Sequence, residues 1–248
     1  MTTLFAFQLR RVGRNRQFLF FTVLLPALFT VFFTEILGGQ AGSTEEYQVY
    51  ATTYMVSMMA YGALGAALGA TIRVSFDRAS GWLRQLRITP VPTSSVVSVD
   101  VAVGMLLTLP SLLVVALVGG LVNGVELAPL TWGGLVAVLW LGSGAFVALG
   151  LLVGYTLDEK AAGGAVGILG VVLAALGGLW VPVQVFPGFL SALAHTLPSY
   201  WYAQLGRDVV AEGGPALLTV LAVAGFTAGF AVLATAVARR RPLHAVAG

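Results

Sequence analysis

Six long runs of uncharged residues divide the sequence and most constrain what it can fold into. They cover residues 17–34, 47–72, 101–125, 127–157, 161–206 and 213–238. A helix needs roughly 20 apolar residues to cross ~30 Å of hydrocarbon. The runs lack the alternation of apolar and polar residues that is typical of barrel strands. The sequence therefore predicts an all-α, polytopic membrane protein.

The overall composition supports a surface that faces lipid. The chain is 58% hydrophobic and only 9% charged, with a mean hydropathy of +0.93. Soluble domains carry about 25% charged residues, so these charges are too few to cover a water-facing exterior. The pI near 9.5 comes from basic residues beside the apolar runs, where membrane topology explains them better than nucleic-acid binding does. Cysteine is absent, which excludes disulfides.

The basic residues also predict an orientation. Four arginines precede the first run, four lie between the second and third, Lys160 follows the fourth, and Arg239–Arg241 close the chain. Only Arg207 falls on the opposite side. Because Lys and Arg in short loops favour the cytoplasmic side, both termini are expected there, with six crossings. High Ala, Gly, Val and Arg-over-Lys usage is typical of a GC-rich bacterium, so we expect the bacterial cell (inner or plasma) membrane.

The run 161–206 is long enough for two spans, which would give seven crossings. Its second half contains Pro182, Pro187 and Pro198, and each proline disfavours helix at the preceding residue. We therefore predict one span at about 161–181 and an external re-entrant helical hairpin over 182–212. Broken helices are tolerated at membrane depth only where they pack against protein. The alternative is an amphipathic surface loop.

Residues 3–16 are predicted to form an interfacial helix at the start of a single transmembrane domain, 1–248. Phe5, Leu9 and Val12 recur at helical spacing, with arginines set away from them. Such a helix lies flat at the headgroups. The alternative is a basic tail that only fixes topology.

Motifs for catalysis, metal binding and ATP binding are missing from the sequence. No G-x-x-x-x-G-K-[ST], H-E-x-x-H or G-x-S-x-G occurs, so an ATP phosphate loop and two hydrolase types are not expected. His195 and His244 are far apart, and no metal site is predicted. Glu35 and Asp100 sit near span ends, whereas ion-coupled carriers usually hold carboxylates at the midplane. The chain is predicted not to be an enzyme, and the energy for transport should come from elsewhere.

The segment 73–95, between the second and third runs, is the most charged stretch in the middle of the chain and is expected in the cytoplasm. It can form a short helix that ends at Thr89-Pro90, because a proline disfavours helix just before itself. Its arginines would set topology even in a disordered loop. Setting the topology requires neither a tryptophan nor the Pro-x-Pro sequence that ends the helix. These features therefore indicate that the segment is a docking surface for a cytoplasmic partner.

Two motifs resemble those of a known family. Asp77-Arg78, Gly81-Trp82, Leu86-Arg87 and Thr89-Pro90 match a coupling-helix signature, although Glu is common where Asp77 stands. After the fifth span, a second motif contains Gly178, Pro182, Phe186-Pro187, Leu197-Pro198, Tyr200, Trp201 and Arg207. In this order and over the whole chain, they resemble ABC transporter permeases of the type-2 exporter (ABC-2) class, and among them the daunorubicin-resistance-like drug-export permeases.

The resemblance implies partners and roles. Two copies of the permease, or two related chains, would pair with two ATP-binding-cassette subunits that hold ATP and Mg, and this chain would hold no cofactor. The ATPase would contact Asp77, Arg78, Gly81, Trp82, Leu83, Leu86, Arg87, Thr89 and Pro90. An external hairpin or gate would be formed by Pro182, Phe186, Pro187, Pro198, Tyr200, Trp201 and Arg207. Aromatic residues also gather at membrane interfaces without a gating role.

The expected function is export of hydrophobic drugs or natural products as the membrane subunit of an ATP-driven transporter. Export of a lipid, a lipid-linked saccharide or a peptide is the alternative within transport. A partnerless channel or scaffold is the alternative from another class. The sequence does not distinguish homodimer from heterodimer or export from import.

Overall fold

The computed structural model describes residues 15–80 and 93–240 of the chain, and all regular elements in these ranges are helical. Six helical segments are long and apolar enough to cross a membrane: Arg16–Ile36, Thr44–Ala79, Val96–Leu121, Pro129–Thr156, Glu159–Leu176 and Leu217–Ala238. This confirms the predicted all-α architecture with six spans. The predicted interfacial helix, 3–16, lies almost entirely outside the described residues.

The first span is a helix with two widened turns. Its elements are α2 (Arg16–Leu19), a π-helical turn η1 (Phe20–Leu24), α3 (Leu25–Phe33) and a second π-helical turn η2 (Thr34–Gly38). Asn15 caps the start, because its side chain accepts a hydrogen bond from the Phe18 N–H at 3.1 Å. Pro26 sits in the first turn of α3. Proline lacks an N–H, so the regular hydrogen-bond ladder cannot pass through it, and η1 lies directly before α3.

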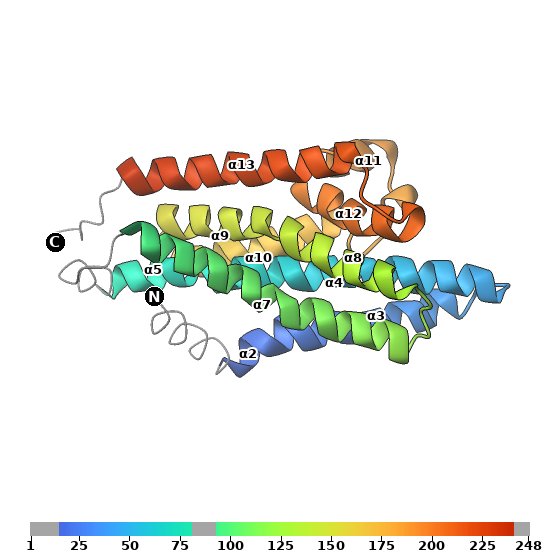
Figure 1. The fold of residues 1–248 in the computed structure, drawn as a ribbon. Coiled ribbons are helices and arrows are strands. Elements are labelled where there is room, and N and C mark those ends of the chain that lie inside the picture. The colour runs from blue at the N-terminus through green and yellow to red at the C-terminus, as the bar shows by residue number, and fades with distance from the viewer. Residues whose placement is uncertain (1–14, 81–92, 241–248) are drawn as a thin grey trace.

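The second span, α4 (Thr44–Thr71), forms the centre of the bundle, and 78% of its apolar window is buried. Fully buried side chains along it include Met55, Met58, Met59, Leu64 and Leu68. After a break at Ile72 the chain continues as α5 (Arg73–Ala79). The remaining helices are arranged around α4 (Figure 1).

The third span, α7 (Thr93–Leu121), ends four residues before the apolar run that predicted it. The chain turns at Gly124, whose φ of 64° is a left-handed conformation that favours glycine. The next helix, α8 (Pro129–Gly142), begins with a proline in its first turn, where the missing N–H costs nothing.

The fourth span is broken in its middle, which the uninterrupted run 127–157 did not predict. The break at Ser143 separates α8 from α9 (Gly144–Thr156). Ser143 Oγ donates to the carbonyl of Trp140 at 2.6 Å. A side chain on Gly142 would collide with Leu205 and Tyr202, so the break lies where another helix packs closely against α8.

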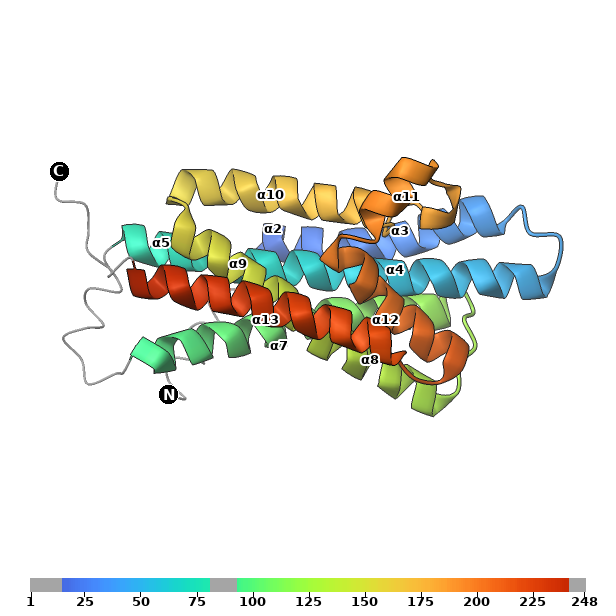
Figure 2. The ribbon, with the colours of Figure 1, turned by 90° about the horizontal axis from the view of Figure 1, so that it is seen from above.

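The fifth span, α10 (Glu159–Leu176), ends five residues earlier than the predicted 181. Gly177 follows, and Gly178 has a φ of 75°, so the helix stops at a turn that needs glycine. A short 3-10 turn, η3 (Val183–Val185), precedes α11 (Gly188–Ala194) and α12 (Pro198–Glu212). The last helix, α13 (Leu217–Arg240), packs along α9. Figure 2 shows α11 and α12 at one end of the bundle.

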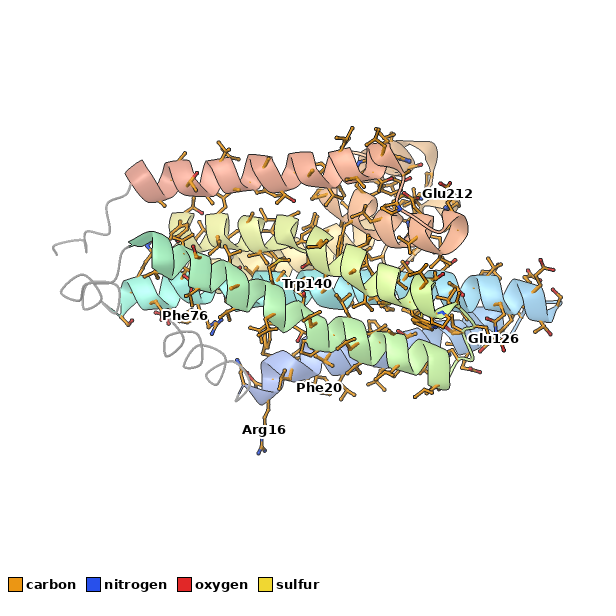
Figure 3. The ribbon with its side chains drawn as sticks, in the orientation of Figure 1. Arg16, Phe20, Phe76, Glu126, Trp140 and Glu212 are labelled. Carbon is orange, nitrogen blue, oxygen red and sulfur yellow. The ribbon has the colours of Figure 1, made fainter. Side chains whose placement is uncertain are left out.

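The two ends of the bundle differ in charge. Glu126 and Glu212 lie at the end that carries α11, α12 and the start of α4, whereas Phe76 of α5 lies at the other end (Figure 3). The C-terminal end of α13 shares the end of α5 (Figure 1). The arginines of α5 and the acidic residues Glu126 and Glu212 are therefore separated by the length of the spans.

Candidate functional site

The junction between α5 and α9 is held by one arginine. Arg78 Nη1 donates hydrogen bonds to the carbonyl oxygens of Gly154 at 2.8 Å and Tyr155 at 2.7 Å. Both carbonyls belong to the last turn of α9, where the final C=O groups have no partner within the helix. A cation at this position also interacts favourably with the helix dipole. Arg78 therefore caps α9 from a different segment of the chain.

The surroundings of Arg78 are close-packed and charged. Asp77 is buried, at 6% exposure, and Arg73 Nε donates to the carbonyl of Ala70 at 2.9 Å. Gly154 lies against Val74 and the backbone of Thr71, leaving no room for a side chain without movement. The close approach lets α9 pack directly on the α4–α5 junction.

Only two members of the predicted docking segment are described by the structure. Asp77 and Arg78 lie on α5 and face the rest of the bundle. The others lie outside the described residues: Gly81, Trp82, Leu83, Leu86, Arg87, Thr89 and Pro90. Their contact with an ATPase stays a prediction.

The three prolines of the predicted hairpin each stand at the beginning of a helical element. Pro182 immediately precedes η3, Pro187 immediately precedes α11, and Pro198 is the first residue of α12. Proline fits helix starts because its φ is already helical and the first N–H groups lack intrahelical partners. The prolines thus shape the connection between α10 and α12.

The aromatic residues of the hairpin form a small cluster at the start of α12. The rings of Tyr200 and Trp201 meet edge to face, 5.3 Å apart, and the His195 ring lies 4.3 Å from Tyr200. Trp201 Nε1 donates to the carbonyl of His195 at 2.7 Å. The bond holds α12 to the end of α11. Phe186 is half-buried in the preceding loop.

The inner face of α12 contains residues that sequence reasoning missed. Ser199 Oγ donates to the carbonyl of Leu173 on α10, and Tyr202 Oη donates to that of Leu139 on α8, both at 2.7 Å. Tyr202 is fully buried, and burial raises its pKa, so the phenol stays neutral. The two hydroxyls pin α12 between two spans. Ser199 and Tyr202 are three residues apart, which places them on the same face of a helix. This spacing was the one feature of the sequence that could have indicated a shared polar face.

Arg207 joins α12 to the centre of the bundle. Its Nη2 donates to Ser57 Oγ on α4 at 3.2 Å and to the carbonyl of Gly178 at 3.1 Å. Burial lowers the pKa of this guanidinium, while the nearby Tyr200 and Asp208 raise it. An arginine remains charged in proteins, so the bundle contains a cation at this end.

Asp208, next along α12, connects the hairpin to the last span. Its Oδ2 accepts hydrogen bonds from the backbone N–H of Ala216 at 3.1 Å and from Thr219 Oγ1 at 2.7 Å, and its Oδ1 accepts from Gln204 Nε2 at 2.7 Å. Ala216 directly precedes α13. A carboxylate at a helix start satisfies free N–H groups and interacts favourably with the helix dipole.

A cavity of about 460 Å³ opens beside Arg207. It lies between the start of α4, the loop before α8, the turn after α10 and the end of α12. Its lining residues are Glu45, Gln48, Val49, Thr52, Thr53, Val56, Glu126, Pro182, Gln184, Arg207, Val210 and Ala211. Among the residues that the structure describes, no group of three or more His, Cys, Asp or Glu side chains is placed to hold a metal ion.

The structure is that of a polytopic helical membrane protein with six spans. One end of the bundle carries the α5–α9 junction capped by Arg78, and the other carries the short helices α11 and α12 before the last span. A family model described as "ABC-2 family transporter protein" matches residues 37–239. The chain therefore belongs to the ABC-2 family of transporter proteins. It is also 27% identical over 237 residues to the "Putative transport permease YvfS" of Bacillus subtilis (strain 168), covering 94% of this chain and 95% of that protein.

Family membership defines the general role of the chain. An ABC-2 permease is the transmembrane subunit of an ABC transporter, and an ABC ATPase is its partner. The chain is therefore not itself the ATPase.

Proposed function

We propose that this chain forms the membrane pathway of an exporter of hydrophobic drugs or natural products, driven by two separate ATP-binding subunits that hold ATP and Mg. The main observation in support is the pair of hydrogen bonds from Arg78 to the last turn of α9. It gives α5, which leads directly into residues 81–90, a rigid connection to the spans. In this proposal the end with α5 is cytoplasmic, and the membrane is the bacterial cell membrane.

In this proposal, movement of the ATPase is transmitted to the spans through a short series of residues. Residues 81–90 contact the ATPase through Trp82, Leu83, Leu86 and Arg87, and Asp77 and Arg78 hold the base of that segment. Arg78 acts on the end of α9, and α10 begins at Glu159, after only Leu157 and Asp158. Nucleotide binding favours one arrangement of this route over another only where the contact energies of the two differ.

The character of the spans supports an apolar cargo. In the part of the chain that the structure describes, the Asp, Glu, Lys and Arg residues of the spans lie near the span ends, as Glu35 and Asp100 do. A pathway without fixed charge at its middle suits amphiphilic or lipid-like molecules. A lipid, a lipid-linked saccharide or a peptide is the second candidate cargo class.

A second permease subunit is proposed to contact α10. Only 17% of the apolar window of α10 is buried. A side chain added at Gly163, Gly164, Gly167 or Gly170 would meet nothing within 4 Å. Small residues permit close approach of helices in lipid, so this face suits contact with another α10 in a homodimer.

The hairpin is proposed to act as an external gate. The inner face of α12 is bonded to α8, α10 and α4 through Tyr202, Ser199 and Arg207, while Tyr200 and Trp201 on the same helix contact His195 at the end of α11. Opening would move α11 and the loop before it against the bonded α12.

The test of ATPase docking is copurification. The tagged chain is extracted in detergent from its native cells, and bound proteins are identified by mass spectrometry and ATPase activity. Trp82→Asp and Leu86→Asp are expected to uncouple ATPase activity from transport without loss of membrane insertion, and Trp82→Asp is expected to lose the ATPase subunit. Val185→Asp, an exposed apolar residue at the opposite end (68% exposed), is the matched control and keeps the subunit. Full transport in both segment variants would refute the docking assignment. A wild-type chain that purifies alone would favour a channel or scaffold.

The α10 contact is tested by crosslinking. Because the chain has no cysteine, Gly167→Cys introduces one thiol, which is expected to form a disulfide-linked dimer in membranes. Gly225→Cys on α13 has equally open surroundings and is the control that stays monomeric on a denaturing gel. Equal crosslinking of both would contradict the proposed face.

A further inference from the structure

The cavity beside Arg207 lies away from the α5–α9 junction, and none of the roles proposed above uses its interior. It combines one cation with neutral polar side chains of Gln48, Thr52, Thr53 and Gln184 and with apolar wall residues, among them Val49 and Val210. Such a mixture is typical of small-molecule sites, in which a few polar groups orient a largely apolar ligand.

The guanidinium of Arg207 has unused hydrogen-bond donors. A guanidinium carries five N–H groups on three nitrogens. Both of its hydrogen bonds, to Ser57 and Gly178, come from Nη2. In the described part of the chain, no acceptor bonds Nε or Nη1, and no carboxylate forms an ion pair with Arg207. A largely buried cation with unpaired N–H groups is costly unless an anion or water accepts from them.

The cavity has a polar mouth and a cationic inner end. Glu45 and Val56 both line it and lie 11 positions apart on α4, which is about 16 Å along a helix. Arg207 bonds to Ser57, next to Val56, so the cation lies at the inner end. Glu45 and Glu126, both exposed, lie toward the mouth. Gln48 fixes this wall, because its Nε2 donates to the carbonyl of Gly124 at 2.8 Å.

We propose that this cavity binds the oxyanion of a singly charged amphiphile, a phosphodiester or a carboxylate whose oxygens accept hydrogen bonds from the free N–H groups of Arg207. Each of these hydrogen bonds is strengthened because the donor and the acceptor are both charged. The valine and proline side chains of the wall receive the adjoining alkyl part. Glu45 and Glu126 repel a second negative charge at the mouth, which selects monoanions. Two sources share this chemistry: a membrane phospholipid and a soluble organic anion.

Binding is measured by calorimetric titration of the purified full-length chain in neutral detergent at low salt. The probes are decanoate for a soluble source and dioctanoyl phosphatidylglycerol for a lipid source, with decanol and dioctanoylglycerol as uncharged counterparts. The wild type is expected to bind at least one anion at least tenfold more tightly than its uncharged counterpart. Phosphatidylglycerol alone binding identifies a lipid ligand, and decanoate alone binding identifies a soluble one. Equal binding of anion and uncharged counterpart in both pairs, or no binding, overturns the proposal.

Two variants locate the site while leaving the hydrogen bonds of Arg207 in place, and a third changes Arg207 itself. Ala211→Trp fills the cavity from an exposed position and is expected to abolish anion binding, while Ala192→Trp on α11, exposed and outside the cavity lining, preserves it. Glu126→Gln removes a repulsive charge and is expected to tighten binding about twofold, the size of a screened interaction across roughly 10 Å of water. Arg207→Lys keeps the charge but loses the N–H groups of Nε and Nη1, and is expected to weaken binding at least tenfold. Unchanged affinity in both Ala211→Trp and Arg207→Lys would overturn the proposal.

The experiment needs neither ATPase nor transport. If the exporter proposal fails, the result of the anion titration still stands. If no anion binds, the docking and crosslinking tests are unaffected.

Discussion

Replacing Arg78 with Met separates its role as a link between α5 and α9 from a role in binding the ATPase. The substitution keeps an unbranched, largely apolar stem but removes the guanidinium and with it both hydrogen bonds to α9. If Arg78 is the link, the variant still binds the ATPase, yet nucleotide hydrolysis no longer drives transport efficiently. If Arg78 is a docking residue, the ATPase is lost, as expected for Trp82→Asp.

The size of the effect follows from the two bonds. A hydrogen bond to a charged group contributes about 1.5–3 kcal/mol. Arg78 is half-exposed, so water partly replaces the lost contacts, and we expect a loss of about 2–3 kcal/mol for the pair. For a chain of this size each kcal/mol lowers the Tm by about 2–4 °C. Arg78→Lys retains one donor group for two neighbouring carbonyls and is expected to lose about half as much.

The assay compares three quantities in detergent and proteoliposomes: the Tm of the permease, the copurifying ATPase, and the number of ATP molecules hydrolysed per transported molecule. Arg78→Met is expected to lower the Tm by about 4–12 °C, from the loss above, to keep the ATPase and to raise the ATP cost of transport severalfold. Arg78→Lys falls between it and the wild type. A wild-type Tm with normal coupling in Arg78→Met would refute the reasoning, and so would loss of the ATPase at a wild-type Tm.

Three further substitutions test how the hairpin is held. Tyr202→Phe removes one buried donor, but Leu139 O still accepts from the Ser143 N–H at 3.0 Å. The loss is therefore only about 0.5–1.5 kcal/mol, seen as a Tm drop of about 1–6 °C; a drop above 10 °C would contradict this. Asp208→Ala leaves the Ala216 N–H and the buried Thr219 hydroxyl without their acceptor and is expected to cost about 2–4 kcal/mol of stability, with a smaller loss for Asp208→Asn. Protease cleavage in residues 212–217 should rise from the wild type to Asp208→Asn to Asp208→Ala. Equal cleavage of all three would argue against the cap. Gly177→Ala places a methyl group against Ser199 Oγ and the carbonyl of Leu173, so it should lower the Tm. Gly225→Ala places its methyl group where no other atom lies within 4 Å, so it should not lower the Tm. Equal Tm values for the two variants would refute the close packing at Gly177.

Particular residues show how far the sequence predicted the site. Pro182, Pro187 and Pro198 predicted that the helix is interrupted after the fifth span, because a missing N–H and a fixed φ are local properties, but they did not predict where each short helix begins. The partners of Ser199, Tyr202 and Arg207 were not predictable, since Leu173, Leu139 and Ser57 are brought together only by the packing of separate helices. The role of Arg78 as a cap of α9 was missed for the same reason: its acceptors are 76 and 77 residues away in sequence.

The sequence by itself determined the number of spans, the positions of the charged ends and the family, because insertion in lipid depends on the length and polarity of contiguous segments. Only the tertiary structure decided that α4 lies at the centre, that the fourth span breaks at Ser143, and that Arg207 lines a cavity with unused hydrogen-bond donors. These features depend on which helices meet. In lipid that choice is made by close packing and interhelical hydrogen bonds, which involve residues far apart in the chain and leave little trace in the hydropathy of any one segment.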